Sequence, residues 1–405
     1  MTKTFSAFKY RNYALFFCGQ SVSQIGTWMQ RIAVNWVVYT TTQSAFMLGV
    51  AAFAQQFPSF LFSLVGGIAA DRNNRYKLLL ITQTASMIQA AVLAILVLTG
   101  HYSIPVILGL SIFLGIVNAF DLPARQPLVH ELVPDKADVP NALALNASMV
   151  NMAVLVGPAL AGIVLEAFGA GICFLMNAIS FLAVLTSLLF MKLPAYVPRT
   201  EKNKAITELK EGFQYIRQTP TIRTALLSMA AVSLFVLSYN TLVPVFAKVV
   251  FKGDASTFGY INSFIGLGAI AGTLLLATLR NKDHNKLLLI NTIVLGIGLI
   301  FFSLTSYFPL AMVFAVLSGF GSMSQTTLCL TMVQLHADTK MRGRVLSYVG
   351  MAYFGMLPLG SLLIGAASQY IGADKTLLVQ GILSVIIAVV IYSIAPKSEN
   401  QTPVQ

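Results

Sequence analysis

The chain has 405 residues, of which 57% are hydrophobic and only 10% are charged, and its mean hydropathy is +0.77. A soluble fold cannot bury so much apolar surface, so this composition excludes a soluble domain and predicts a polytopic protein of the lipid bilayer. The net charge of +12 is spread over short polar segments with no basic face among aromatic residues, which argues against nucleic acid as a partner.

Residues that hold metals or cofactors are sparse. The cysteines Cys18, Cys173 and Cys329 lie singly in apolar runs, so we expect packing residues rather than disulfides or a metal cluster. The four histidines fall in predicted loops, and no G-x-x-x-x-G-K-S/T loop is present. The first residues are polar and basic without a cleavage site, which predicts an uncleaved N-terminus. We expect no metal and no cofactor.

A membrane-spanning helix needs about 20 apolar residues, and the sequence offers twelve such stretches. The predicted spans are residues 13–40, 46–70, 78–100, 104–122, 142–168, 172–191, 224–250, 258–279, 287–305, 310–333, 345–370 and 377–395. Basic residues concentrate at the N-terminus, in the even-numbered loops and in the tail, whereas the odd-numbered loops and their flanks hold only Lys248, Lys252 and Lys375. Both termini are therefore predicted to be cytoplasmic.

One long polar insert separates the sixth and seventh predicted spans. Its second part, AITELKEGFQYIRQTP, has apolar residues at intervals of three and four, which predicts an amphipathic helix on the inner membrane surface. The expected fold is all-α, with six membrane helices in 1–191, a cytoplasmic linker in 192–223, and six more helices with a short tail in 224–405.

Internal repeats support two similar bundles. The letters KLLLI occur after the second predicted span, at 77–81, and after the eighth, at 286–290. The segment from Leu132 aligns with the segment from Leu335 at an offset of 203, which superposes Gly157 on Gly360. Two copies of a six-helix unit fit a transporter built from parallel repeats.

The loop GIAADRNNRYK, residues 67–77, packs four charges between two uncharged spans. A basic cytoplasmic loop follows from the positive-inside bias alone. The order of residues adds more, because it resembles the loop between helices 2 and 3 of the major facilitator superfamily, G-x-x-x-D-R-x-G-R-R/K. Asn74 stands where that pattern has Gly, and Asn also accepts left-handed backbone angles. The resemblance implies a conformational latch that contains Gly67, Asp71, Arg72 and Arg75.

The fifth predicted span contains GPALAG, in which Gly157, Pro158 and Gly162 predict a kinked helix in close contact with another helix. A packing kink without further function is one reading. The pattern also resembles G-P-x-x-G-G of major facilitator exporters, which favours export.

A polar stripe runs along the first predicted span at steps of three or four residues, so its members share one helix face. The stripe consists of Gln20, Gln24, Trp28, Arg31 and Asn35. Arg31 lies deep in the span, where a cation should face the bundle interior or a wet cavity. We expect a cavity-lining helix in which Arg31 binds substrate or an anion or takes part in coupling, with structural pairing as the alternative.

Acidic residues avoid the middle of every predicted span. Asp121, at the inner end of the fourth span, is the best candidate for proton coupling, which usually needs a titratable group in the transport path. Asn118, Asp121 and Arg125 follow helical spacing, although Pro123 is expected to interrupt the helix. A local ion pair between Asp121 and Arg125 is an equally good interpretation.

The second half offers isolated polar residues among aromatic neighbours, and such a cavity suits an amphipathic organic solute. We single out Asn240, Gln325 and Tyr353 as candidates that line it. The segment RGRV carries Arg342 and Arg344 at the start of the eleventh span, where local charge balance is the plain explanation. The segment also resembles one major facilitator branch, which implies a second-half counterpart of the latch.

Three further segments, NYALFFCGQSVSQIGTWMQR, FDLPARQPLVHELVP and the region of GPALAG, resemble the bacterial branch of the enterobactin exporter and the macrolide efflux proteins, the transmembrane secretion effectors. The likeness extends over nearly the whole chain. It implies an inner-membrane carrier, expected to be monomeric, that exports an amphipathic small molecule such as a siderophore or drug by alternating access, driven by protons. A lipid or lysolipid flippase and an importer of a small organic solute remain alternatives, whereas a membrane enzyme would need clustered acids, bases or metal ligands.

Overall fold

The computed structural model describes residues 3–191, 205–279, 283–339 and 341–396, and every regular element in these segments is a helix. The chain forms two compact units. Unit 1 contains Met1–Thr200 and Val243–Ser263, and unit 2 contains Glu201–Leu242 and Phe264–Gln405. The first part of the expected linker, 192–204, lies outside the described residues, and the expected domain boundaries stay a prediction.

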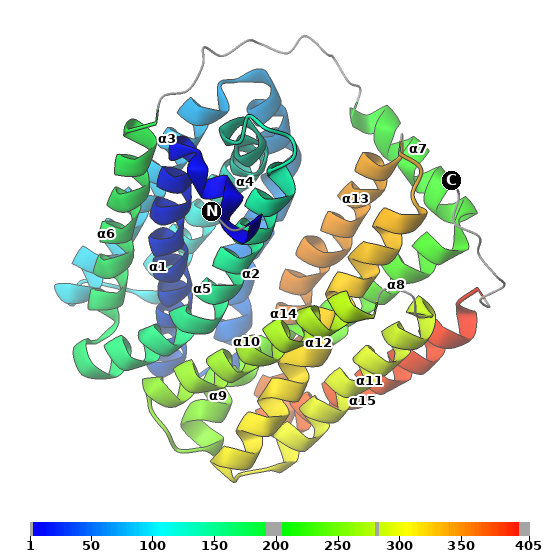
Figure 1. Ribbon diagram of the computed structural model, residues 1–405. Coiled ribbons are helices and arrows are strands. Elements are labelled where there is room, and N and C mark those ends of the chain that lie inside the picture. Colours follow the sequence, from blue (N-terminus) through cyan, green and yellow to red (C-terminus); the bar gives the residue numbers. More distant parts are fainter. Residues whose placement is uncertain (1–2, 192–204, 280–282, 340, 397–405) are drawn as a thin grey trace. The chain divides into compact units, whose positions relative to one another are not determined.

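Unit 1 begins with the short 3₁₀ helix η1 (Lys3–Lys9). Its long helices are α1 (Arg11–Thr42), α2 (Ala45–Arg72), α3 (Arg75–Leu98), α4 (Ile104–Leu132), α5 (Val139–Phe168) and α6 (Ala170–Leu189). Helix α1 packs against α5 and α6, α3 packs against α4 and α6, and α2 packs against α4 (Figure 1). The short α9 (Val243–Val245), the π-helical η3 (Phe246–Val250) and the first turns of α10 also belong to this unit.

Unit 2 repeats much of this packing with interrupted helices. Its elements are α7 (Ala205–Gln218), α8 (Pro220–Phe235), the 3₁₀ helix η2 (Leu237–Leu242), the later part of α10 (Ala255–Thr278), α11 (His284–Leu304), α12 (Phe308–His336), α13 (Arg342–Gly350), the π-helical η4 (Met351–Gly355), α14 (Met356–Ile371) and α15 (Ala373–Ile394). Helix α11 packs against α12 and α15, and α8 packs against α12, α14 and α15.

The interruptions divide the predicted spans 224–250 and 345–370 into shorter elements. Pro244 follows η2, and Pro358 lies just after η4. Because proline has no backbone N–H, neither residue can donate to the carbonyl four positions earlier. Local 3₁₀ and π segments are the usual response of a helix to such a lost bond.

The helix starts reproduce the sequence repeat. Asn74 Oδ1 accepts from the backbone N–H groups of Tyr76 and Lys77 at the start of α3. Asp283, which precedes the second KLLLI at the same spacing, accepts from Asn285 and Lys286 at the start of α11. Both are N-caps, which satisfy the first free N–H groups of a helix.

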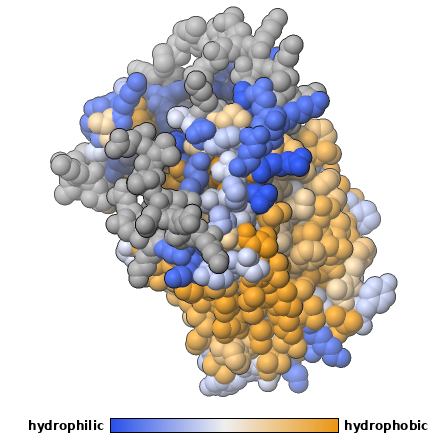
Figure 2. Space-filling model, turned by 90° about the vertical axis from the view of Figure 1, so that its right-hand side faces the viewer, coloured by the Kyte–Doolittle hydropathy of each residue, from blue (hydrophilic) through white to orange (hydrophobic). Residues whose placement is uncertain are grey.

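Eleven helical segments of the described chain are long and apolar enough to cross a membrane, and two of them, Pro220–Val250 and Arg342–Ile371, are counted across their interruptions. Helix α1 has 32 residues but is not among these eleven, because the polar stripe interrupts its apolar sequence. Exposed apolar residues recur along α15 at Val379, Ile382, Ile386 and Val390, as expected of a lipid-facing stripe. Figure 2 shows a broad hydrophobic surface on the face that it displays.

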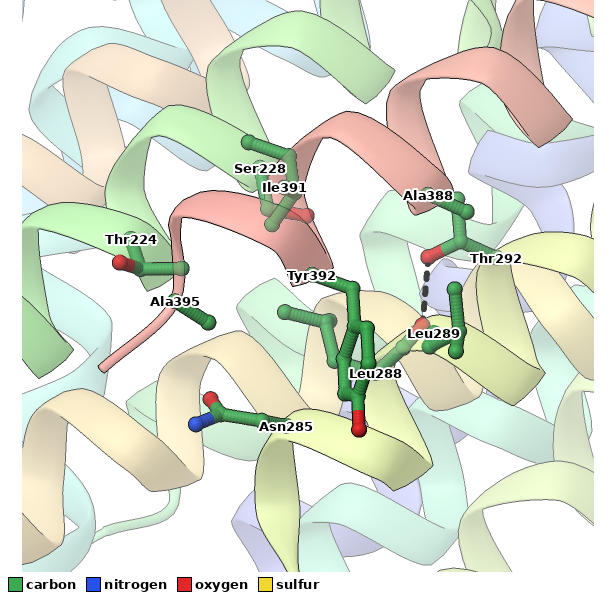
Figure 3. Close-up of a pocket in the computed structure, with 10 residues that line it drawn as sticks. All are labelled: Thr224, Ser228, Asn285, Leu288, Leu289, Thr292, Ala388, Ile391, Tyr392 and Ala395. Atoms are coloured by element: carbon green, nitrogen blue, oxygen red, sulfur yellow. Dashed lines mark hydrogen bonds between the residues drawn. The ribbon is translucent and has the colours of Figure 1, made fainter. Parts of the chain in front are cut away.

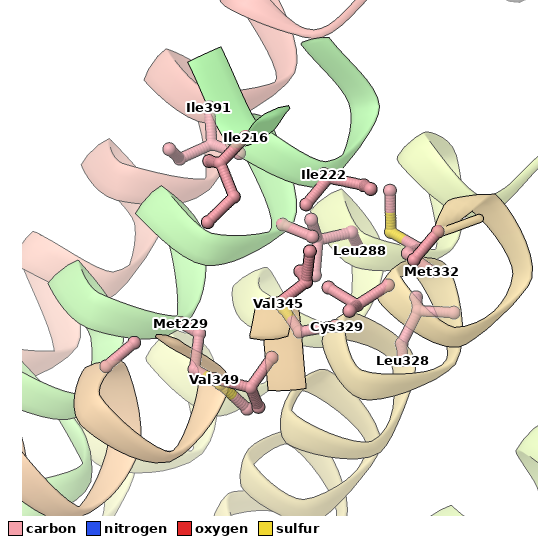
Figure 4. Close-up of a cluster of buried hydrophobic side chains, with 14 residues drawn as sticks. Ile216, Ile222, Met229, Leu288, Leu328, Cys329, Met332, Val345, Val349 and Ile391 are labelled. Atoms are coloured by element: carbon pink, nitrogen blue, oxygen red, sulfur yellow. The ribbon is translucent and has the colours of Figure 1, made fainter. Parts of the chain in front are cut away.

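Each unit has its own apolar core. In unit 2, Ile216 of the amphipathic α7 packs with residues of α8, α11, α12, α13 and α15 (Figure 4). In unit 1, Tyr13, Phe16, Leu79 and Leu128 join α1, α3 and α4. Glycines permit the closest helix crossings, since a Cβ on Gly66 of α2 would lie 1.9 Å from the Ala119 carbonyl oxygen of α4.

Candidate functional site

The polar residues of the α1 stripe bond to different neighbouring helices. Gln20 is buried and accepts a hydrogen bond from Arg125 of α4, Oε1 to Nη1 at 3.1 Å. At the other end of the stripe, Asn35 accepts from Gln55 of α2 at 3.0 Å. These residues therefore tie α1 to two neighbouring helices of unit 1. Gln24, also on the stripe, is partly buried.

Arg31 and Trp28 form the middle of the stripe. The Arg31 guanidinium lies over the Trp28 ring, with Cζ 4.7 Å from the ring centroid, and both residues are partly buried. A cation over an indole face is attracted by the ring quadrupole. The Trp28 side chain lies against Gly157 of α5, where an added Cβ would come within 2.6 Å of Trp28 Cβ. Gly157 thus gives Trp28 the room that the pair needs.

Asp121 is the centre of a buried polar network in unit 1. Its Oδ1 accepts from Thr82 Oγ1 at 2.9 Å and from Gln83 Nε2 at 2.7 Å, both on α3. Its Oδ2 lies 3.4 Å from Arg125 Nε, one helical turn further along α4. The expected ion pair is present. The carboxylate therefore joins α4 to α3 through three donors.

One expectation about α4 is wrong. The helix was expected to be interrupted at Pro123, yet it continues through Pro123 and Pro127 to Leu132. The longer helix carries Glu131 to the predicted latch. Asn118, on the same helix, is partly buried.

At the predicted latch, Arg75 joins two carboxylates. Arg75 lies 3.2 Å from Asp71 and 2.8 Å from Glu131, and its Nε donates to the Ala70 carbonyl at 3.3 Å. Arg72 is exposed. Nothing lies within 4 Å of a Cβ added to Gly67, so the close approach of α2 to α4 is made by Gly66 instead.

Asn74 does not adopt the left-handed backbone angles that Asn accepts. Its φ is −65° and ψ is 110°, and it caps α3. The departure from the family's glycine is thus explained by the cap: an Asn side chain supplies hydrogen bonds that glycine cannot supply.

Unit 2 holds a similar pair on α13. Arg344 bonds Glu211 of α7, and Gly212 lies beside Arg344 Cβ, which lets the two helices approach. Arg342 is exposed. The unit 2 pair therefore joins the amphipathic α7 to α13.

The other candidates of unit 2 lie in different surroundings. Gln325 is fully buried and its amide donates to Ser228 of α8 at 3.3 Å, so in this structure it joins two helices. Asn240 is exposed on η2. Tyr353 lies in η4, partly buried, with its ring centroid 5.0 Å from that of Phe354.

The GPALAG segment makes close contacts along α5. Pro158 lies within a continuous helix. A Cβ on Gly162 would lie 2.9 Å from the Ala255 carbonyl oxygen, and one on Gly259 would lie 2.5 Å from the Pro158 carbonyl oxygen. This contact with the first turns of α10 lies within unit 1.

Comparison with known proteins places the chain in a family. Residues 2–404 match the family model described as transmembrane secretion effector. The chain belongs to this family of the major facilitator superfamily. The staphyloferrin A transporter of Staphylococcus aureus (strain NCTC 8325 / PS 47) is 30% identical over 391 residues, which cover 94% of this chain and 96% of that protein.

Two further likenesses agree with this assignment. Macrolide efflux protein A of Streptococcus pyogenes is 24% identical over 395 residues, covering 94% of this chain and 96% of that protein. The crystal structure of a D-xylose-proton symporter matches with a TM-score of 0.76 at 15% identity, over 97% of this chain and all of that one. The likeness to the symporter structure concerns the fold alone.

The family assignment confirms the expected class. The transmembrane secretion effector described here is a multi-pass membrane transporter and not an enzyme. Its homologues include transporters of siderophores and drugs. Among the described residues, no group of three or more His, Cys, Asp or Glu side chains could hold a metal ion.

Sequence reasoning missed a second polar network of the transporter. In unit 1, Gln30 of α1 donates to Gln89 of α3 at 2.9 Å and accepts from Asn177 of α6 at 2.8 Å, and all three are buried. Gln30 lies one position before Arg31, off the stripe that the sequence indicated. The sequence feature that could have indicated Gln30 is an amide side chain within an apolar span, which usually marks an interhelical hydrogen bond.

A narrow crevice lies in unit 2 between α8, α11 and α15 (Figure 3). Its walls include Ser228, Asn285, Thr292 and Tyr392, and the space between them is too narrow to admit a water molecule. Pockets for drug-sized ligands are usually about 300–1,000 Å³. The crevice is therefore too small to hold such a molecule, and it contains none of the candidates that the sequence singled out.

Proposed function

We propose that this transporter exports an amphipathic small molecule, a siderophore or a drug, in exchange for protons. The observation that carries the proposal is the partly buried Arg31–Trp28 pair on the polar stripe of α1. A guanidinium and an indole together suit a solute with both an anionic and an apolar part. The similarity to the staphyloferrin A transporter and to macrolide efflux protein A supports both substrate classes.

The proposed mechanism is alternating access by a monomer with twelve spans, α1 being the first, in two six-helix bundles. Arg31 and Trp28 bind the solute, and the rest of the stripe lines the cavity. Asp121 is the proposed proton carrier. Its protonation would release Arg125, which would then hold Gln20 differently and pass the change to α1.

The latch is proposed to govern the rate of the conformational change. In unit 1 it consists of Arg75 with its two carboxylate partners, and in unit 2 of Arg344 with Glu211. Arg72 and Arg342, exposed beside these pairs, are proposed to lie on the cytoplasmic side, as are both termini. Single cysteines at these two positions should react with an impermeant maleimide in everted vesicles and not in intact cells. Labelling in intact cells would refute the proposed orientation.

Transport in everted inner-membrane vesicles tests the function. Vesicles from a host that lacks its own exporters are energised to make their lumen acidic, and labelled staphyloferrin A and erythromycin are offered separately. Export from the cell corresponds to uptake by everted vesicles, so we expect uptake of at least one of the two solutes. This uptake should be lost when a protonophore is added. Uptake only by right-side-out vesicles would instead indicate an importer. Transfer of a labelled lysolipid, with neither solute moved, would indicate a flippase.

A further inference from the structure

The seventh predicted span is broken in unit 2, and the break frees backbone carbonyls. Helix α8 ends at Phe235, Val236 has φ −122° and ψ −53°, and η2 begins at Leu237. The N–H of Tyr239 would bond the Phe235 carbonyl in an α-helix, but it donates to Val236 O at 3.0 Å. An unpaired backbone carbonyl is costly inside a membrane, so the Phe235 oxygen needs another donor.

Gln380 of α15 supplies that donor. Its Nε2 lies 3.1 Å from Phe235 O, 3.2 Å from Val236 O and 3.3 Å from Ser238 Oγ. The residue is fully buried. The opposite orientation of the amide would place its oxygen against two carbonyl oxygens, so the surroundings themselves fix the amino group toward the break.

The other side of the break is closely packed. A Cβ on Gly360 of α14 would lie 2.2 Å from the Leu234 carbonyl oxygen. Thr241 of η2 donates to Ser361 of α14 at 3.1 Å. Helix α14 therefore supports the segment through contact, whereas the bond to the freed Phe235 carbonyl comes from Gln380.

The corresponding amide of unit 1 has a different partner. Asn177 of α6 precedes Gln380 by 203 positions, the offset that also relates Gly157 to Gly360. Asn177 donates to the Gln30 side chain at 2.8 Å, and α1 is unbroken there. The same place in the two repeats thus bonds a side chain in unit 1 and a helix backbone in unit 2.

We propose that Gln380 is a positioning residue for transport, which holds the seventh span in its broken form so that η2 moves as one hinge. Breaks of this kind concentrate the change of backbone angles in few residues. Without the amino group the Phe235 carbonyl has no partner, and the segment either rewinds or loosens. In both cases the transporter loses a defined hinge, and its turnover falls while the substrate's contacts stay intact.

Hydrogen exchange tests, without any substrate, whether Gln380 holds the seventh span in its broken form. The full-length transporter in lipid nanodiscs is compared with Gln380→Met, which keeps the side-chain length and removes the donor, and with the matched unit 1 variant Asn177→Leu. We expect the exchange rate in 236–242 to change about tenfold in Gln380→Met, upward if the segment loosens and downward if it rewinds. Tenfold is the factor that one unpaired buried carbonyl gives. Exchange in 25–34 of α1 should stay unchanged in this variant. Asn177→Leu should show the reverse pattern. Equal exchange in 236–242 for Gln380→Met and wild type would overturn the proposal.

Transport kinetics separate a positioning residue from a merely structural one. In proteoliposomes with an imposed pH gradient, labelled erythromycin serves as the probe, which rests on the proposed function. We expect kcat to fall about tenfold in Gln380→Met with KM within about twofold. Loss of folded protein, or a change in KM alone, would refute the positioning role. If the wild type moves no erythromycin, the proposed drug export fails, while the exchange result still decides whether Gln380 holds the break.

Discussion

Asn177 and Gln380 show how two copies of one architecture have come to differ. In unit 1 the helices α1 to α6 are unbroken, and their buried polar side chains bond mostly to one another, around Gln30 and around Asp121. In unit 2 the seventh and eleventh spans are interrupted, and Gln380 bonds a helix backbone instead. The two units therefore carry an amide at the same place but give it a different partner.

The difference suggests separate tasks. Continuous helices tied by side chains transmit a local charge change as a rigid body, whereas interrupted helices bend. We interpret unit 1 as the part that senses substrate and proton, and unit 2 as the part that flexes. The following experiments sharpen or break this comparison.

The largest effect is expected at Arg31. Replacing Arg31 with Ala removes the partly buried cation of the α1 stripe, so transport should fall to the level of vesicles without the protein. Folded protein should persist, as measured by fluorescence-detected size exclusion. Arg11→Ala, at the exposed start of the same helix, is the matched control and should transport normally. Undiminished transport by Arg31→Ala would remove the residue from the site and leave unit 1 without its proposed sensor.

A large loss of stability is expected for Asp121→Asn. Arg125, whose side chain is only 18% exposed, would lose its charged partner, and breaking a buried pair from one side costs about 3 kcal/mol. Thermal unfolding in detergent should show this loss, and the double variant Asp121→Asn with Arg125→Met should recover part of it. In unit 2, Gln325→Leu breaks a neutral interhelical bond and should cost about 0.6 kcal/mol. Equal losses at the two sites would erase the contrast between the units.

A smaller, kinetic effect is expected at the latch. Asp71 is exposed, so its bond to Arg75 contributes little to stability. Asp71→Asn should therefore leave thermal unfolding unchanged but slow turnover several-fold, with the half-saturating substrate concentration unaltered. Arg344→Gln in unit 2 should act alike. A variant with normal turnover and weakened affinity would contradict the latch.

The smallest effect concerns acid stability outside the spans. Lys9 and Tyr10 donate to Asp138 beside α5, and the Lys9 ammonium is the main reason why the pKa of Asp138 is lowered to about 2. A lowered carboxyl pKa stabilises the fold at neutral pH, and this contribution disappears as the pH falls from about 4 to about 2. The difference in melting temperature between wild type and Asp138→Asn should thus shrink over this range. A constant difference would show that the ion pair is unimportant.

The sequence was sufficient to predict most of the helices and the Asp121–Arg125 pair. Long apolar runs have few alternatives in a membrane, and the pair follows from helical spacing. The partners of this pair, Thr82 and Gln83 on Asp121 and Gln20 on Arg125, could not be predicted, since they meet it only through tertiary packing. The sign of the broken span was present in Pro244, which removes a backbone donor inside an apolar run. The role of Gln380 had no such local sign.

Helix α4 is long enough to reach beyond a hydrocarbon layer. Its 29 residues give a rod of about 44 Å, whereas the hydrocarbon layer is about 30 Å thick. Glu131, near the end of this helix, lies 2.8 Å from Arg75 at the start of α3. We expect a bilayer of different thickness to change the tilt of α4, and with it the strength of the Arg75–Glu131 pair, with no ligand involved.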